Sequence, residues 1–202
     1  YDRATPLTNV PVLVNLGTNI PGFDYSQFTS PEGYDLSFTD PSNQTLLNYE
    51  IDQWNTNGVS SVWVNVPLIA SSRSSLLAYW GNAYKTNPPV SCTDGSVWTS
   101  YAAVFHLKES GGPDIDSTTA HPATSGTAPV VTSAGMVGSG EAFDGTSQHV
   151  VPGVIDLGNT FALSAWVNLD TTCTNMQPIF DSASGTWNGN GVFLYVNGWN
   201  TA

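Results

Sequence analysis

Two carboxylates at alternate positions are the residues of this sequence best suited to acid–base chemistry. Glu50 and Asp52 lie in the run Glu-Ile-Asp-Gln-Trp at residues 50–54, which we predict to be a strand. On a strand, residues two apart point to the same face. Glycosidic bond cleavage with retention uses two carboxyl groups about 5–5.5 Å apart. The third position on this face is Trp54, so that pair is incomplete. We therefore expect an acidic strand that makes surface or inter-domain contacts.

Aspartates in glycine-flanked loops are a second group with chemical potential. Asp114 and Asp116 lie in Asp-Ile-Asp-Ser-Thr, and Asp144 lies in Phe-Asp-Gly-Thr. Ca²⁺ takes about six to eight oxygen ligands from carboxylates, carbonyls and water. These three aspartates are our candidate Ca²⁺ ligands. The alternative is that Asp116 and Asp144 only hold turns through hydrogen bonds to the backbone.

Aromatic residues in loops supply a third kind of candidate site. Trp187 and Asn188 adjoin each other in a glycine-rich segment, and Trp199 follows another Gly residue. A sugar site pairs an apolar platform with a few groups that hydrogen-bond hydroxyls. We predict that Trp187, Asn188 and Trp199 bind carbohydrate, with core or interface packing as the alternative use of the two indoles.

The elements that must position these residues are strands. Apolar side chains alternate with other residues in short segments separated by turn sequences, which is typical of half-buried strands. No segment holds a 3.6-residue period, and an all-β fold of sandwich type is the economical prediction. The predicted strands lie at residues 12–16, 35–39, 62–66, 161–169 and 192–196.

Charge excludes several classes of partner. Charged residues make up 10% of the 202, against about 25% in an average soluble protein, and the formal net charge is −12. We therefore expect neither nucleic acid nor an anionic membrane surface as a partner, because both require basic residues. No apolar run approaches the roughly 20 residues of a transmembrane helix. The sequence starts at Tyr1 rather than Met, so we expect a mature or trimmed product.

A stiff Pro-Pro segment followed by Thr-Asp-Gly-Ser predicts a boundary, with one domain over residues 1–90 and a second over residues 97–202. The two cysteines, Cys92 and Cys173, lack the spacing of a metal site. In an oxidising compartment they could pair and close a loop of about 80 residues, worth roughly 4 kcal/mol in the entropy model. Two separate thiols are the other interpretation, and the sequence leaves both open.

The first domain resembles a known bacterial family. The segments Pro-Val-Leu-Val-Asn-Leu, Gly-Tyr-Asp-Leu-Ser-Phe-Thr-Asp and Asn-Tyr-Glu-Ile-Asp-Gln-Trp begin at residues 11, 33 and 48. Val-Trp-Val-Asn-Val-Pro and Ala-Tyr-Trp-Gly-Asn follow from residues 62 and 78. In this order and spacing they resemble domain of unknown function 2341. That resemblance implies no biochemical activity.

The second domain resembles the opening half of a laminin-G-like, concanavalin-A-like jelly roll. The segments that carry the resemblance are Val97-Trp98, residues 103–107, residues 116–118, residues 140–146 and residues 161–167. The resemblance implies a pair of β-sandwiches, an extracellular setting, carbohydrate or surface binding, and often one bound Ca²⁺. The domain is shorter than such jelly rolls usually are. We therefore expect it to be incomplete at its C-terminal side, with edges covered by a larger polypeptide or a neighbouring copy.

Together these patterns predict a non-catalytic secreted or cell-surface module for glycan binding, adhesion or extracellular assembly. Its expected partner is a polysaccharide or cell-surface glycan. One alternative is a glycoside hydrolase of laminarinase type that uses Glu50 and Asp52. Another is a structural subunit of an extracellular filament or coat. Fold analogy supports all three, and a fold does not determine function.

Overall fold

The computed structural model describes residues 4–71, 73–111, 113–125, 129–132, 135–169, 176–182 and 191–196. The predicted all-β class is confirmed: antiparallel sheets dominate, and helical structure among the described residues is limited to two 3₁₀ turns, η1 (Tyr25–Gln27) and η2 (Val90–Cys92). No helix in that part of the chain has the length and apolar character needed to span a bilayer. The chain divides into two compact units, Tyr1–Ile155 and Asp156–Ala202.

The first unit contains a three-stranded sheet in the order β1-β5-β4, made of β1 (Leu7–Leu16), β5 (Ser60–Ile69) and β4 (Tyr49–Gln53). Valines face one another across its long pair, with Val12 opposite Val64 and Val14 opposite Val62. β-branched side chains suit this pleated surface because they pack well against cross-strand neighbours. The predicted alternation over residues 62–66 is confirmed, because Val62, Val64 and Val66 are buried.

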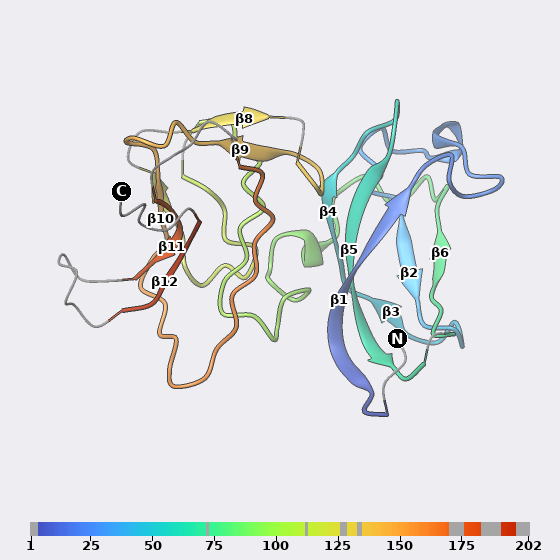
Figure 1. Ribbon diagram of the computed structural model, residues 1–202. Helices are drawn as coiled ribbons and strands as arrows, with labels where there is room; N and C mark the ends of the chain where they lie inside the picture. Colours follow the sequence, from blue (N-terminus) through green and yellow to red (C-terminus); the bar gives the residue numbers. More distant parts are fainter. Residues whose placement is uncertain are drawn as a thin grey trace. The chain divides into compact units, whose positions relative to one another are not determined.

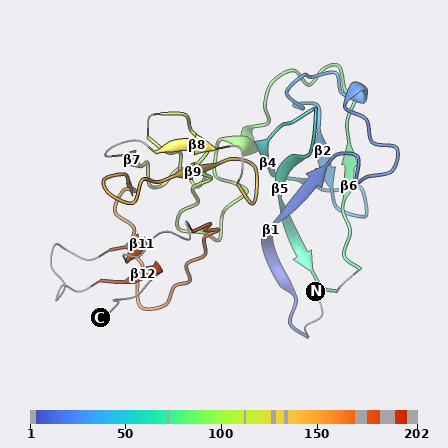
Figure 2. The ribbon, with the colours of Figure 1, turned by 45° about the horizontal axis from the view of Figure 1, so that its top comes forward.

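A second sheet of the first unit has the order β3-β2-β6, with β3 (Leu46–Leu47), β2 (Ser37–Thr39) and β6 (Leu77–Tyr79). Its central residue is Phe38, which is fully buried and lies between Leu47 and Ala78. Figure 1 and Figure 2 show this sheet facing the β1-β5-β4 sheet. The core between them consists of Leu16, Leu36, Phe38, Leu47, Tyr49, Val62, Val64 and Val66.

Aromatic side chains pack at one margin of this core. Phe28 stacks on Trp80 with ring centroids 5.6 Å apart and meets Trp54 edge to face at 4.9 Å. Gly33 approaches the Trp54 ring so closely that a Cβ there would lie 2.5 Å from it, and its φ of +74° is one that side chains disfavour. Trp54 therefore belongs to the hydrophobic packing and not to a polar face.

The rest of the first unit is built from short pairs: β7 (Thr124–Ser125) with β10 (Val150–Val151), and β8 (Val130–Thr132) with β9 (Gly140–Ala142). Between η2 and β7 the chain is mostly irregular, with one isolated antiparallel bridge between Phe105 and Asp116. Irregular backbone still needs partners for its polar groups, and side-chain carboxylates supply many of them here.

Among the described residues of the second unit, β11 (Gln177–Asp181) and β12 (Phe193–Val196) form an antiparallel pair, with a register shift between Pro178 and Phe180. The strand predicted near residues 192–196 thus forms. The strand predicted over residues 161–169 does not: these residues are exposed and no strand is assigned to them. The alternating pattern is present, but extended backbone becomes a strand only when a neighbour completes its hydrogen bonds, and none does so in the described part of the chain.

One buried carboxylate joins two loops of the sandwich. Asp35 is almost completely buried. It accepts hydrogen bonds from the backbone of Thr29 and Ser30 at 3.0 and 3.1 Å, and from Gly81 N after β6 at 2.7 Å. Burial alone would raise the pKa of Asp35, but these hydrogen bonds outweigh it and hold the pKa below its usual value. The charged form of Asp35 therefore stabilises the fold.

We predict that Asp35→Asn lowers the free energy of unfolding by about 2–4 kcal/mol, because the amide leaves buried N–H donors without an acceptor. Urea denaturation followed by tryptophan fluorescence measures the change. Asp94→Asn is the matched control, since Asp94 is exposed and accepts one backbone hydrogen bond, from Ser96. An equal, small effect of both substitutions would contradict this role of Asp35.

Candidate functional site

The two carboxylates singled out in the sequence lie on β4, on the face opposite the sandwich core. Tyr49 and Ile51 pack toward the core, whereas Glu50 and Asp52 face away from it. The pairing with β5 shifts between Ile51 and Gln53, which makes Asp52 the extra residue of a β-bulge. A bulge changes the side-chain alternation. For this reason Trp54 turns back into the core and does not share the face of Glu50 and Asp52, as strict alternation would predict.

Glu50 is held by three residues from the segment that follows η2. Its side chain is only 6% exposed. Trp98 Nε1 donates to Oε2 at 2.5 Å, and Ser117 Oγ donates to Oε1 at 2.8 Å. His106 Nε2 lies 3.4 Å from Oε1. Both carboxylate oxygens of Glu50 therefore have partners inside the protein.

Asp52 has a similar environment on the other side of the same imidazole. His106 Nδ1 lies 3.6 Å from Asp52 Oδ2, and Trp63 Nε1 donates to that oxygen at 3.4 Å. Lys108 Nζ lies 3.3 Å from Oδ1 and donates to the backbone oxygen of Asp52 at 3.0 Å. His106 thus lies between two buried carboxylates. We call Glu50, Asp52, His106, Lys108, Trp98, Trp63 and Ser117 the Glu50 network.

The Glu50 network attaches residues 97–118 to the outer face of the β1-β5-β4 sheet. Trp63 meets Trp98 edge to face with ring centroids 5.2 Å apart, and Trp98 lies 5.5 Å from the His106 ring. Asn65 Nδ2 adds a 2.9 Å hydrogen bond to Val97 O. The acidic strand, for which the sequence predicted surface or inter-domain contacts, is therefore covered on its outer face by residues 97–118.

The electrostatics favour a charged, structural Glu50. Burial would raise its pKa, but His106, Trp98 and Ser117 outweigh that effect and hold the pKa below its usual value. A general acid near neutral pH needs the opposite shift and must reach its substrate. With all four carboxylate oxygens of Glu50 and Asp52 already bonded or paired, the arrangement favours fastening a loop over transferring a proton.

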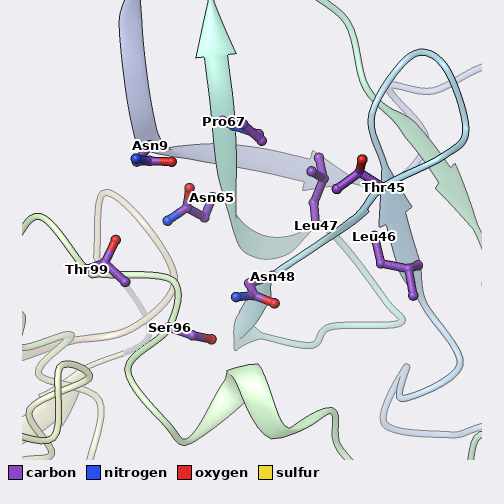
Figure 3. Close-up of a pocket in the computed structure, with 9 residues that line it drawn as sticks. All are labelled: Asn9, Thr45, Leu46, Leu47, Asn48, Asn65, Pro67, Ser96 and Thr99. Atoms are coloured by element: carbon purple, nitrogen blue, oxygen red, sulfur yellow. The ribbon is translucent and has the colours of Figure 1, made fainter.

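A groove lies beside β3 and is also lined by residues of β1, β5 and the loop at residues 96–99. Figure 3 shows its lining side chains, which come from β1, the β3–β4 segment, β5 and the loop at residues 96–99. The groove has a volume of about 290 Å³. It is lined by Asn9, Thr45, Leu46, Leu47, Asn48, Asn65, Pro67, Ser96 and Thr99, none of which is charged.

A second hollow of about 260 Å³ shares part of this lining and extends along β2 and η2. The shared residues include Leu46, Asn48 and Ser96. Leu46 is 72% exposed, so it offers an apolar surface next to amide groups. The Ser96 hydroxyl is buried and has no hydrogen-bond partner among the described residues. Small-molecule sites combine apolar surface with a few placed polar groups in this way.

Two of the three predicted Ca²⁺ ligands hold turns. Asp116 is buried, and its carboxylate accepts hydrogen bonds from the backbone N–H groups of Val104, Thr118 and His121 at 2.8–2.9 Å. Asp144 is exposed, and its Oδ1 accepts from three successive backbone N–H groups at residues 146–148. In Asp116 burial opposes these bonds but does not prevail, and the pKa of both carboxyls is lowered. Asp116 and Asp144 therefore hold turns through hydrogen bonds to the backbone, which was the alternative to Ca²⁺ binding for these two residues.

The remaining candidates are placed as follows. Asp114 is buried. In the described ranges, no three His, Cys, Asp or Glu side chains come together as a group that could hold a metal ion. Trp187, Asn188, Trp199 and Cys173 lie outside the described residues. Cys92 is a free thiol whose Sγ lies 3.5 Å from Tyr49 O.

Sequence reasoning did not include Lys108 or Trp98 in the site. A usable signal existed for Lys108, because it is one of only four Lys and Arg residues and lies two positions after His106. Leu107 between them has a φ of +55°, so the pair is not presented by a regular strand. Nothing in the sequence pairs Trp98 with Glu50, 48 positions earlier.

A comparison with known protein families found a match for part of the first unit. Residues 32–97 match a family model described as a domain of unknown function, DUF2341. The matched segment holds β2 to β6 and therefore Glu50 and Asp52, and it ends just before Trp98. No match was found in the comparisons with curated proteins or with solved structures.

We predict that Glu50→Gln destabilises the protein by about 2–3 kcal/mol, because a neutral amide accepts weaker hydrogen bonds and its N–H₂ group opposes a donor. Equilibrium urea unfolding gives the value. Glu32→Gln is the control, since Glu32 is an exposed glutamate of the same matched segment. A difference of less than 0.5 kcal/mol, roughly the level of ordinary surface substitutions, would contradict a stabilising Glu50.

The sign of the pH dependence follows from the lowered pKa of Glu50. Its contribution is present above the unfolded pKa of about 4.3 and disappears as the pH falls through the lower folded pKa. The gap between wild type and Glu50→Gln should therefore be complete at neutral pH and shrink below about pH 4.

Proposed function

We propose that this chain is a non-catalytic secreted or cell-surface module that binds glycans, and that the groove beside β3 holds a neutral, hydroxyl-rich ligand. The observation that carries the proposal is the groove lining, with its three asparagines, the buried unpartnered Ser96 hydroxyl and the exposed Leu46. Amides and hydroxyls match the donor–acceptor pairs of sugar hydroxyls, and Leu46 offers a contact for the apolar face of a ring.

Charge supports the same type of ligand. The main part of the groove contains no charged side chain, and the formal net charge of −12 disfavours anionic partners. The proposal includes the laminin-G-like continuation over residues 97–202. Antiparallel pairs β7–β10, β8–β9 and β11–β12 in that range support it. The proposed extracellular location rests on the acidic composition and on the resemblance of residues 97–202 to a laminin-G-like domain.

The laminarinase-type alternative has no structural observation in its favour. Glu50 is 6% exposed and Asp52 is 8% exposed, and both are bonded within the Glu50 network. A retaining hydrolase needs two accessible carboxyl groups at a sugar ring. Reducing-sugar release from β-glucans that disappears in Glu50→Gln, with a normally folded variant, would favour that alternative over a binding module.

Assembly has one specific observation in its favour and is our second candidate function. Residues 161–169 are exposed and form no assigned strand, and Trp166 is 75% exposed. Phe161, Leu163 and Leu169 on this segment are also exposed. An uncharged, alternating apolar segment of this kind can add to a strand of a neighbouring molecule.

For glycan binding, we predict that Asn48→Ala weakens binding of neutral polysaccharides about five- to tenfold, the value of one hydrogen bond of ~1–1.4 kcal/mol. A glycan array identifies ligands, and isothermal titration calorimetry measures the affinity. Asn57→Ala is the matched control, because Asn57 is exposed in the β4–β5 turn away from the groove. Absence of glycan binding, or equal affinities of the two variants, would refute the groove as the site.

For assembly, we predict that the molar mass measured by light scattering rises with protein concentration and that Trp166→Gln reduces this rise. The reason is the loss of a large exposed aromatic surface. Val154→Gln is the control, since Val154 is 94% exposed outside the segment. A constant monomer mass at all concentrations would count against assembly through residues 161–169.

A further inference from the structure

One lysine of the first unit lies against the carboxyl group of a buried aspartate. Lys108 Nζ is 3.3 Å from Asp52 Oδ1 and donates to the backbone oxygen of the same residue at 3.0 Å. The side chain of Asp52 is only 3% exposed, whereas that of Lys108 is 29% exposed. Lys108 follows Asp52 by 56 positions along the chain. Two separate parts of the fold therefore hold an amine next to a carboxyl carbon.

The other oxygen of this carboxyl group faces two nitrogen atoms. Trp63 Nε1 donates to Asp52 Oδ2 at 3.4 Å, and His106 Nδ1 lies 3.6 Å from that oxygen. The second ring nitrogen of His106, Nε2, lies 3.4 Å from Glu50 Oε1. An imidazolium donates from both nitrogens, so Glu50 orients a ring that directs its other N–H toward Asp52. Hydrogen bonds of this kind are often long before a reaction and tighten as it proceeds.

This arrangement contains the parts that acyl transfer requires. Lys108 supplies a nucleophile, and the Asp52 carboxyl carbon is the group it can attack. Trp63 and His106 supply donors to the oxygen that gains charge during the attack. The rings of Trp63 and Trp98 lie 6.3 and 5.5 Å from the His106 ring. Aromatic surface of this kind excludes water, which strengthens these interactions.

Burial also favours the reactive form of the pair. Two opposite charges that are held away from water lose hydration. Transfer of one proton from Lys108 to Asp52 makes both groups neutral. A neutral amine is nucleophilic, and desolvation is one of the ways in which proteins activate lysine. Because the fold holds the two groups in contact, their reaction avoids the entropy cost of an encounter between separate molecules.

We propose that Lys108 Nζ and Asp52 Cγ form an amide bond within the chain, which attaches residues 97–118 covalently to β4. The covering segment has little regular secondary structure, and a covalent bond would hold it where the Glu50 network now does. This inference goes beyond the proposed function. It holds equally for a glycan-binding module and for an assembly subunit.

The step is a condensation that needs no co-reactant. In the ion pair Nζ carries three protons. The first moves to Asp52 Oδ1, after which Nζ bonds to Cγ and the electron pair of the C–O double bond moves onto Oδ2. As that double bond forms again, the Cγ–Oδ1 bond breaks. Oδ1 then leaves as water with the second proton of Nζ, relayed by solvent at the exposed side of Lys108. The third proton stays on the amide nitrogen.

The test is the mass of the whole chain, measured by mass spectrometry under denaturing conditions. We expect the wild-type chain to be lighter than its 202-residue sequence by one water molecule. Lys108→Arg keeps a cation beside Asp52 and should have the full mass of its sequence. Lys85→Arg is the matched control, because Lys85 Nζ donates to the hydroxyl of Ser37. It should retain the loss of one water molecule.

Trypsin locates the bond. Its cleavage sites follow the Lys and Arg residues at positions 3, 73, 85 and 108. Complete digestion of an unlinked, denatured chain therefore releases residues 4–73, 86–108 and 109–202 as separate peptides. An amide at Lys108 blocks cleavage there, so residues 4–73 and 86–202 should remain joined in one product.

Two outcomes would overturn the proposal. One is a wild-type chain of full mass that trypsin divides after position 108, which would leave Lys108 and Asp52 as an ion pair only. The other is a loss of water that persists in Lys108→Arg, with residues 4–73 and 109–202 released separately. That result would place the loss at a succinimide of Asp94-Gly95 or Asp144-Gly145.

Discussion

The burial of the Glu50 carboxylate is the constraint on which the first unit depends. A charge on the outer face of a sheet can be covered only if donors come with the covering segment, because an unmatched buried carboxylate is strongly destabilising. Trp98 and Ser117 provide those donors, and His106 connects Glu50 to Asp52. The irregular path of residues 97–118 follows from this requirement, since the segment has little regular secondary structure of its own. The sandwich thereby acquires a third layer without an additional sheet.

Other carboxylates of the protein are also matched by hydrogen-bond donors and not by basic side chains. Asp35, Asp116 and Asp144 each collect several backbone N–H groups of loops that have no sheet to bond to. In a chain with 12 Asp and few basic residues, backbone donors take the place that lysine and arginine occupy elsewhere. The exceptions are both side-chain oxygens of Asp114 and Oε2 of Glu141, which are buried and accept no hydrogen bond from the residues that the structure describes.

Periodicity was sufficient to predict β1, β2 and β5 of the sandwich, but it did not predict the short strands β3 and β6. The valines of β1 and β5, and Leu36 and Phe38 near β2, alternate because one face of each strand is buried in a common core. The bulge at Asp52 could not be predicted this way, since it depends on how β4 aligns with β5. The pattern over residues 161–169 predicted a strand that is not formed, because periodicity reports one-sided burial potential and not the presence of a partner. Glu50 and Asp52 were recognised as a pair, but their partners lie 11–67 positions away along the chain.

The end of the family match has a consequence for how this protein is divided. The match stops at residue 97, whereas the compact unit continues to Ile155. A segment cut at the end of the match would keep Glu50, Asp52 and Trp63 but lose Trp98, His106 and Lys108. It would present two uncompensated acids and an indole to solvent on a sheet face that is otherwise covered. The covering segment at residues 97–118 is therefore as much a part of the folded sheet as the strands that it covers.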